Sequence, residues 1–437
     1  MSIELTTFLL FGTMLLLMLT GLPMAFVLGS VGITFSLFLT GPASLNLILF
    51  TTMTFTGSFI FVAIPLFLFM GNMLERSGIA DLLFEFFYHI FGSVRGGLAV
   101  STVFICCIFA AMCGVTGAAT VSMGLIALPA MLKRGYSKHL ATGTVQAGGA
   151  LGFLIPPSVV MIVYSFVARV SVGKLFLGGI VPGIILATIF VIYILVRCNF
   201  QPELAPIVSK EKRLSFSEKI KLSKALILPA LLVALVLGTI FFGICSPTEA
   251  SAIGALGSII CAVVNKKFGW KIFYEALSRT AGVTGMLIWL SISAASYSTV
   301  YSYLGAPELI SKVFMGITTS KFGILLLIQL VFLIMGFFLD EFAILFICMP
   351  ILVPIIKSFG YDPIWFGILY VVNMQMAYIT PPFGLNLFYM RAVAPKEVSL
   401  RDIYISAFPF VFCQAIGLIL LMLFPKLVLW LPELILK

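Results

Sequence analysis

The sequence predicts an all-α protein that crosses a membrane several times and is built from two related halves. Hydrophobic residues form 61% of the 437 residues and charged residues 10%, with a mean hydropathy of +1.20. Soluble domains are roughly 45–50% apolar and about 25% charged. Apolar runs long enough to cross a hydrocarbon core about 30 Å thick recur along the whole chain. The N-terminal segment lacks a basic start and a cleavage site, so we interpret it as the first span.

A polar stretch rich in Gly and Pro occurs twice, which is the observation that divides the chain. Moving the sequence by 225 positions places Pro156 and Pro157 on Pro381 and Pro382, and Gly135 on Gly360. Backbone groups freed inside a membrane are tolerated only where they line a cavity. Interruptions at corresponding places in two halves therefore indicate the binding site of a transporter.

Each half is predicted to contain spans, a re-entrant hairpin and a broken transmembrane helix. The first half, 1–196, has spans at 5–19, 23–40, 55–74 and 175–196, a hairpin at about 95–133 and a broken helix at about 138–167. The second half, 225–437, has spans at 225–244, 248–264, 283–303 and 403–424, a hairpin at about 321–356 and a broken helix at about 363–391. An amphipathic helix is expected at 79–91, on the cytoplasmic surface.

Charge placement predicts the orientation. The linker 197–224 carries seven Lys and Arg residues, and most of the 26 in the chain fall in loops on the same predicted side. The positive-inside rule places that side in the cytoplasm. An odd number of crossings then separates the halves, so the second is inverted relative to the first and both termini are periplasmic. The net charge of +10 is thus explained without a nucleic-acid partner.

Several chemistries have no support in the sequence. The eight Cys form no CxxC pair and only two His are present, which argues against a transition-metal site. The absence of a Walker A motif excludes nucleotide hydrolysis by that route. Clustered intramembrane carboxylates are lacking, which argues against an integral membrane enzyme. Ser246 and Glu249 are interpreted as a structural helix cap.

Polar groups at the two repeated stretches are the candidate ligands. In the first half, the hydroxyls of Thr116 and Thr120 and carbonyls near Gly117 lie at the hairpin tip, facing a break at 152–157 where prolines free further carbonyls. In the second half, Asp340 lies at the tip. Oxygen ligands of this kind suit sodium, and helix N-termini suit an anion.

The second break adds Thr380, Gly384 and Asn386. Asp340 is the first candidate because an ionisable group at membrane depth is costly unless it is used or paired. A second interpretation places Asp340 near the outer surface, where it would be solvated.

The roles of four further polar side chains stay open at this point. Thr116 and Thr120 either face a ligand or hydrogen-bond to their own helix. Asn373 and Gln375 either contact a ligand or bridge helices.

The ordered motifs resemble the large membrane subunit of tripartite ATP-independent periplasmic (TRAP) transporters, which is DctM-like and belongs to the ion transporter superfamily. The stretches that carry this resemblance span nearly the whole chain: GLPMAFVLG, AIPLFLFMGNML, RGGLA, LPAMLKRGY, GALGFLIPPSVVMIVY, LFLGGIVPG, SPTEA and DPIWFGILYVVNMQMAYITPPFGLNLF.

The resemblance implies sodium-driven uptake of a small organic anion, a carboxylate or a sulfonate, across a bacterial inner membrane by an elevator mechanism. It also implies a separate small four-helix membrane subunit and a periplasmic substrate-binding protein. Two symmetric sites suggest two or more sodium ions. The competing hypothesis is a stand-alone sodium-coupled anion carrier that needs no binding protein.

The resemblance also assigns residues. The sodium ligands it implies are Thr116, Gly117, Thr120, Gly152, Pro156, Asp340, Thr380, Pro381 and Gly384. The substrate ligands we expect are Thr116, Asn373, Gln375 and Asn386.

Overall fold

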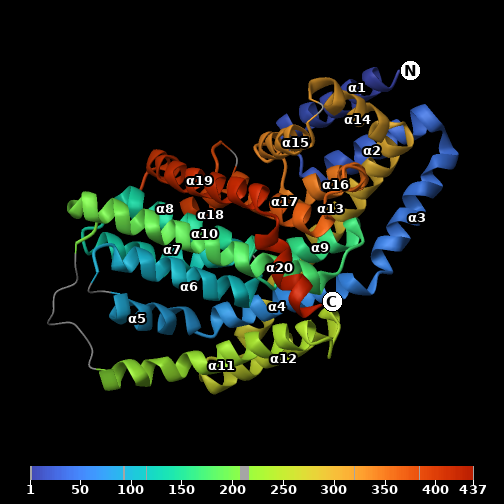
Figure 1. Cartoon of the computed structure of the whole chain (residues 1–437). Helices are drawn as coiled ribbons and strands as arrows, with labels where there is room; N and C mark the ends of the chain where they lie inside the picture. The colour runs from blue at the N-terminus through green and yellow to red at the C-terminus, as the bar shows by residue number, and fades with distance from the viewer. Residues whose placement is uncertain are drawn as a thin grey trace.

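The computed structural model describes residues 2–91, 94–114, 116–206, 216–318, 320–382 and 384–436, without the side chains of 116 and 216–226. Within these ranges the chain forms twenty α-helices and four short 3-10 helices, and no strand (Figure 1). The predicted all-α class is therefore confirmed.

The first half contains ten α-helices: α1 Ile3–Leu19, α2 Met24–Thr40, α3 Leu45–Thr56, α4 Ala63–Arg76, α5 Ile79–Phe91, α6 Gly97–Cys113, α7 Thr116–Leu132, α8 Lys138–Ala150, α9 Val159–Ala168 and α10 Val172–Phe200. The span predicted at 55–74 instead begins with a short 3-10 helix at Phe59–Val62 and continues as α4. Helix α3 before it was not predicted. It ends at Thr56 because Gly57 and Ser58 follow, and these residues fit a turn better than a helix.

The second half contains the other ten: α11 Phe216–Phe241, α12 Pro247–Val264, α13 Trp270–Tyr303, α14 Ala306–Ile317, α15 Lys321–Met335, α16 Glu341–Ser358, α17 Pro363–Tyr378, α18 Leu385–Val393, α19 Leu400–Leu423 and α20 Lys426–Ile435. Helix α13 begins at Trp270 and not near 283. Its first turns carry Lys271, Glu275 and Arg279, which lower the local hydropathy and conceal the helix from a search for apolar runs.

Six helices in the described ranges are long and apolar enough to cross a membrane, or seven if α14 and α15 form one bent span. The paired helices at the predicted hairpins are 17 and 17 residues long in the first half, and 15 and 18 in the second. The predicted cap at Ser246 is also present, since Ser246 and Glu249 form a reciprocal capping box at the start of α12. Helix α10 extends to Phe200 and helix α11 begins at Phe216, so the linker 197–224 is helical at both ends.

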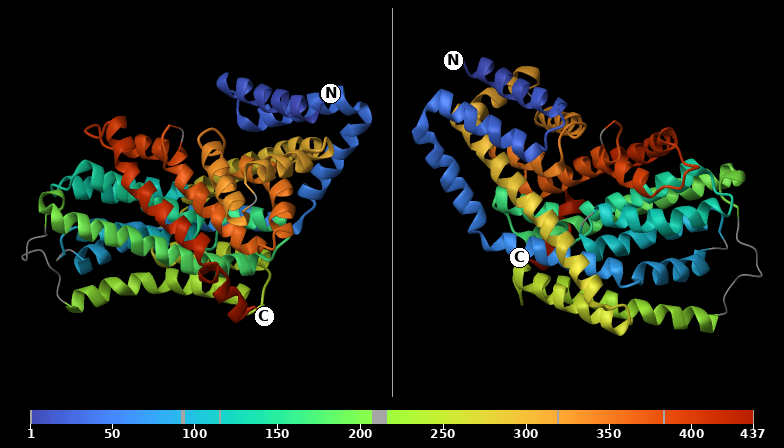
Figure 2. Two further views of the ribbon diagram at one scale, coloured as in Figure 1. Left: turned by 45° about the horizontal axis from the view of Figure 1, so that its top comes forward. Right: turned by 180° about the vertical axis from the view of Figure 1, so that it is seen from behind.

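The halves are interleaved. Helices α5 to α8 pack on one another in order, with α10 against α6 and α8 and α11 next to α5 (Figures 1 and 2). From the first half, α4 packs on α12 and α13 of the second, and α2 packs on α13. Helices α8 and α19 are in close contact at Gly143, where an added Cβ atom would lie 2.3 Å from the carbonyl oxygen of Ser406. None of the eight cysteines is exposed and none forms a disulfide.

Candidate functional site

A cavity of about 410 Å³ lies where both hairpin tips meet both broken helices. Gly117 and Asp340 reach it from the tips, and Phe153 and Tyr378 from the two breaks. Helices α2, α4 and α13 also contribute residues to the lining. The structure thus brings together segments that are more than 200 positions apart in the sequence.

The tip of the first hairpin packs so closely on the first break that Gly114, at the tip, has no space for a side chain. At Gly114, which has a φ of 63°, an added Cβ atom would lie 2.6 Å from the carbonyl oxygen of Pro157. The amide of Val159 donates to the carbonyl oxygen of Gly114 at 3.4 Å. One turn further along α7, Thr120 packs on Gly149 of α8, where an added Cβ atom would lie 2.0 Å from Thr120 Oγ1. Close contact between the tip and the broken helix therefore depends on two glycines.

Thr120 carries a polar atom without a described partner. Its side chain is fully buried, and Oγ1 has no hydrogen-bond partner among the residues that the structure describes. A buried hydroxyl oxygen of this kind is normally satisfied by protein, water or a ligand. The Oγ1 atom of Thr120 is therefore available to bind a ligand close to the first break. The side chain of Thr116, which begins α7, lies outside the described part of the chain.

The tip of the second hairpin is capped by an acid. Asp340 precedes α16, and its Oδ1 accepts hydrogen bonds from the amides of Phe342 and Ala343, both at 2.9 Å. The hydroxyl of Tyr370, on α17, donates to the carbonyl oxygen of Glu341. Asp340 and Glu341 both line the central cavity, and both also line a second cavity of about 260 Å³ beside it. Asp340 is therefore a half-buried helix cap at the cavity.

The second break gathers carbonyl oxygens around Gly384. An added Cβ atom there would lie 2.5 Å from the carbonyl oxygen of Tyr378 and 2.9 Å from that of Thr380. The hydroxyl of Thr380 donates to the carbonyl of Met376 at 2.7 Å, within its own helix. Each break contains one cis peptide bond, between Pro156 and Pro157 in the first and between Pro381 and Pro382 in the second.

The oxygen atoms at the two breaks are suitable ligands for a hard monovalent cation such as sodium. Carbonyl oxygens of unwound helices are the typical ligands of sodium in secondary transporters. The unpaired Thr120 Oγ1 in the first half and the carbonyls around Gly384 in the second are groups of that type. Gly152 is buried at the first break, whereas Pro156 lines a separate apolar cavity of about 700 Å³ between α6, α10 and α11.

Three of the expected substrate ligands lie outside the lining of the central cavity. Asn373, Gln375 and Asn386 are fully buried. The Nδ2 atom of Asn373 donates to the carbonyl oxygen of Gln329 at 2.7 Å and to its Oε1 atom at 3.0 Å, so Asn373 bridges α17 and α15. The Nδ2 atom of Asn386 donates to the carbonyl oxygen of Gln146 at 2.8 Å. In this conformation the three residues lie behind the cavity wall.

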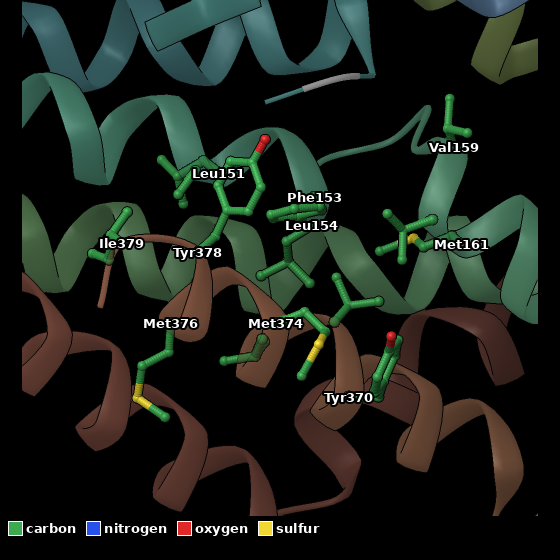
Figure 3. Close-up of a cluster of buried hydrophobic side chains, with 14 of the residues drawn as sticks. Leu151, Phe153, Leu154, Val159, Met161, Tyr370, Met374, Met376, Tyr378 and Ile379 are labelled. Carbon is green, nitrogen blue, oxygen red and sulfur yellow. The ribbon is translucent and has the colours of Figure 1, made fainter. Parts of the chain in front are cut away.

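Buried apolar side chains hold the first break against α17. The rings of Phe153 and Tyr378 meet edge to face with centroids 4.8 Å apart. In the same cluster Leu154 lies toward Met374, and Leu151 lies beside Tyr378 (Figure 3). The two broken helices therefore pack directly on each other, across the boundary between the halves.

Three charged residues line the cavity. Asp340 and Glu341 come from the second hairpin, and Arg279 comes from α13. Arg279 pairs with Glu75 of α4 at 3.4 Å. The sequence analysis missed Arg279 because it treated the start of α13 as a loop, although a basic residue close to an apolar span was a usable signal.

Comparison with known proteins decides the family. The family model described as "Tripartite ATP-independent periplasmic transporter, DctM component" matches residues 11–427. The chain belongs to the DctM family of TRAP transporters. A C4-dicarboxylate TRAP transporter large permease from Vibrio cholerae is 33% identical over 442 residues, with 96% of each chain covered.

Further TRAP relatives differ in the compounds named for them. An ectoine TRAP large permease from Halomonas elongata is 29% identical and covers 97% of this chain and 98% of its own. An isethionate TRAP permease from Oleidesulfovibrio alaskensis is 33% identical over 89% of this chain, which corresponds to 61% of that longer protein. The crystal structure of the YdaH transporter from Alcanivorax borkumensis has a TM-score of 0.61 at 17% identity, covering 92% of this chain and 96% of the other, so the two share a fold.

Membership of the TRAP family establishes a coarse function. The chain is a multi-pass membrane permease and a secondary transporter, not an enzyme. TRAP large permeases work with a small membrane subunit and a periplasmic binding protein.

Proposed function

We propose that this chain is the large subunit of a sodium-driven importer for a small organic anion, a carboxylate or a sulfonate, which moves its substrate by an elevator mechanism. The observation that carries this proposal is the convergence of both hairpin tips and both breaks on one cavity. Because those segments contain freed backbone groups, the cavity is where a cation and an anion find ligands together.

Two or more sodium ions would be held by oxygen atoms at the two tips. In the first half we assign Thr116, Gly117, Thr120, Gly152 and Pro156, and in the second Asp340, Thr380, Pro381 and Gly384. Sodium supplies the positive charge that lets an anion approach the carboxylates on the hairpin side. Filling both sites also satisfies groups such as Thr120 Oγ1, which would otherwise lack a partner beside the substrate path.

The moving part in this proposal comprises the hairpins and broken helices, which pack on each other at Phe153 and Tyr378. The fixed part comprises α2, α4, α12 and α13, whose pairs join the two halves. The second half is inverted relative to the first, with the linker 197–224 in the cytoplasm and the termini in the periplasm. A separate four-helix small subunit completes the membrane complex, and a periplasmic binding protein delivers the anion.

The test is uptake into proteoliposomes that contain this chain and its co-encoded small subunit, with an inward sodium gradient. Radiolabelled succinate, isethionate and N-acetylneuraminate are supplied with and without the co-encoded binding protein. Uptake that needs both sodium and the binding protein supports the proposal. Uptake with sodium alone supports the stand-alone carrier, and uptake unaffected by sodium refutes the assignment of the two cation sites.

A further inference from the structure

The residue of interest is Arg279, which faces the central cavity from the α13 wall. Its side chain is 40% exposed, and it is the one Lys or Arg among the described residues that line this cavity. The acids in the lining, Asp340 and Glu341, lie on the hairpin side. A cation at membrane depth is costly, and it is typically found where it binds an ion or a substrate.

The ion pair of Arg279 leaves most of the hydrogen-bonding capacity of the guanidinium group unused. One nitrogen, Nη1, lies 3.4 Å from Glu75 Oε2, and Glu75 is its one ion-pair partner among the described residues. A guanidinium group has five N–H donors arranged as a planar fork. A single contact to Glu75 can fix the position of the side chain, while the remaining donors are available for a carboxylate or sulfonate.

A second ion pair between the same two helices provides the contrast. Arg76 of α4 lies 3.7 Å from Glu275 of α13, one turn before Arg279. Arg76 does not line the central cavity. Both ion pairs link α4 to α13, so an ion pair that holds these two helices together exists without Arg279. Of the two arginines, only Arg279 also lines the cavity.

We infer that Arg279 binds the acid group of the transported anion from α13, a helix outside the hairpins and the broken helices. This inference rests on the proposed function, because it needs an anion in the cavity. Asp340 and Glu341 would repel that anion, and a cation on another helix of the lining gives its acid group an attractive partner. Since α13 belongs to the fixed part, Arg279 would bind the anion at one stage of the movement and release it at another.

The test measures binding of the anion to the purified complex of this chain with its small subunit, in saturating sodium. The probe is whichever of succinate, isethionate and N-acetylneuraminate shows the largest sodium-dependent uptake by the wild-type protein. Its apparent Kd is obtained from the rise in Tm with ligand concentration. The variants are Arg279→Gln, Arg279→Lys and, as the matched control, Arg76→Gln.

Loss of charge-assisted hydrogen bonds predicts that Arg279→Gln weakens binding roughly 10- to 100-fold. Arg279→Lys keeps the charge but loses the fork, so we expect an intermediate loss. Arg76→Gln should stay within about 3-fold of wild type, because a partly exposed pair contributes little. The amide derivative of the probe, which lacks the acid charge, should bind wild type and Arg279→Gln with similar affinity. A purely structural role for Arg279 would weaken binding of both compounds.

An unchanged Kd in Arg279→Gln overturns the inference, as does an equal loss in Arg76→Gln. If Arg279→Gln does not fold, the Kd of Arg279→Lys decides, and an unchanged value overturns the inference. Failure of the proposed function looks different, because wild type itself would then show no sodium-dependent uptake of any of the three acids.

Discussion

Replacing Gly384 by Ala should weaken sodium binding at the second break. The added Cβ atom would lie 2.5 Å from the carbonyl oxygen of Tyr378 and 2.9 Å from that of Thr380. Both neighbours are backbone atoms, so they cannot move aside as the end of a flexible side chain would. Overpacking of this kind costs typically 1–3 kcal/mol. If the strain is relieved by displacing these carbonyls, the sodium concentration for half-maximal uptake should rise roughly 5- to 100-fold.

The assay is sodium-dependent uptake in proteoliposomes, together with Tm measured over a sodium titration. The matched control is Gly238→Ala in α11, where an added Cβ atom meets no other atom within 4 Å. The control should resemble wild type in both measurements. Unchanged sodium dependence in Gly384→Ala would refute the assignment of a cation site at these carbonyls. A lower Tm that is equal with and without sodium would mean that the strain affects folding and not the site.

Three further substitutions separate binding roles from structural ones. Asp340→Asn keeps a good helix cap but removes the charge, so sodium affinity should fall roughly 10-fold or more while the Tm without sodium changes little. A sodium affinity equal to that of wild type would contradict this prediction. Asn373→Leu leaves Gln329 without its hydrogen-bond partner, so thermal unfolding should show a loss of about 1–3 kcal/mol in stability. A changed Kd for the anion at an unchanged Tm would instead indicate that Asn373 is a substrate ligand. Asp402→Ala removes the capping box with Ser399 at the start of α19 and should lower the free energy of unfolding by about 1 kcal/mol. The sodium dependence of uptake should not change, and a change would contradict a purely structural role for Asp402.

The interruptions were predictable because they follow from local chemistry. Proline lacks an amide hydrogen and glycine adopts a positive φ, so a repeat of such residues locates breaks without knowledge of the fold. The structure has helix ends at Gly114, at 151–158 and before Asp340, as the repeat indicates. The capping box of α12 follows from four consecutive residues in the same way.

The cavity wall was less predictable, because it depends on which helices meet. Nothing near Arg279 in the sequence shows that α13 packs on α4, or that Glu75 lies 3.4 Å away. Asn373 was equally ambiguous. Its partner Gln329 lies 44 positions earlier, and only the packing of α17 on α15 makes it a link between helices. Helices α14 and α20 were missed because each is too short to cross a membrane.

Five of the eight cysteines are buried and three are partly buried, among them Cys245 in the loop between α11 and α12, so the chain with Cys245→Ala is a suitable background for mapping the two sides of the membrane. Thiol reagents react with accessible thiolates, and burial in apolar surroundings suppresses that reaction. A single cysteine placed at Ser358, an exposed residue at the end of α16, would therefore be the site that a membrane-impermeant maleimide labels first. One at Lys133, its exposed counterpart in the first half, should be labelled only from the opposite side. Intact and inverted vesicles would thus reveal directly which way each half faces.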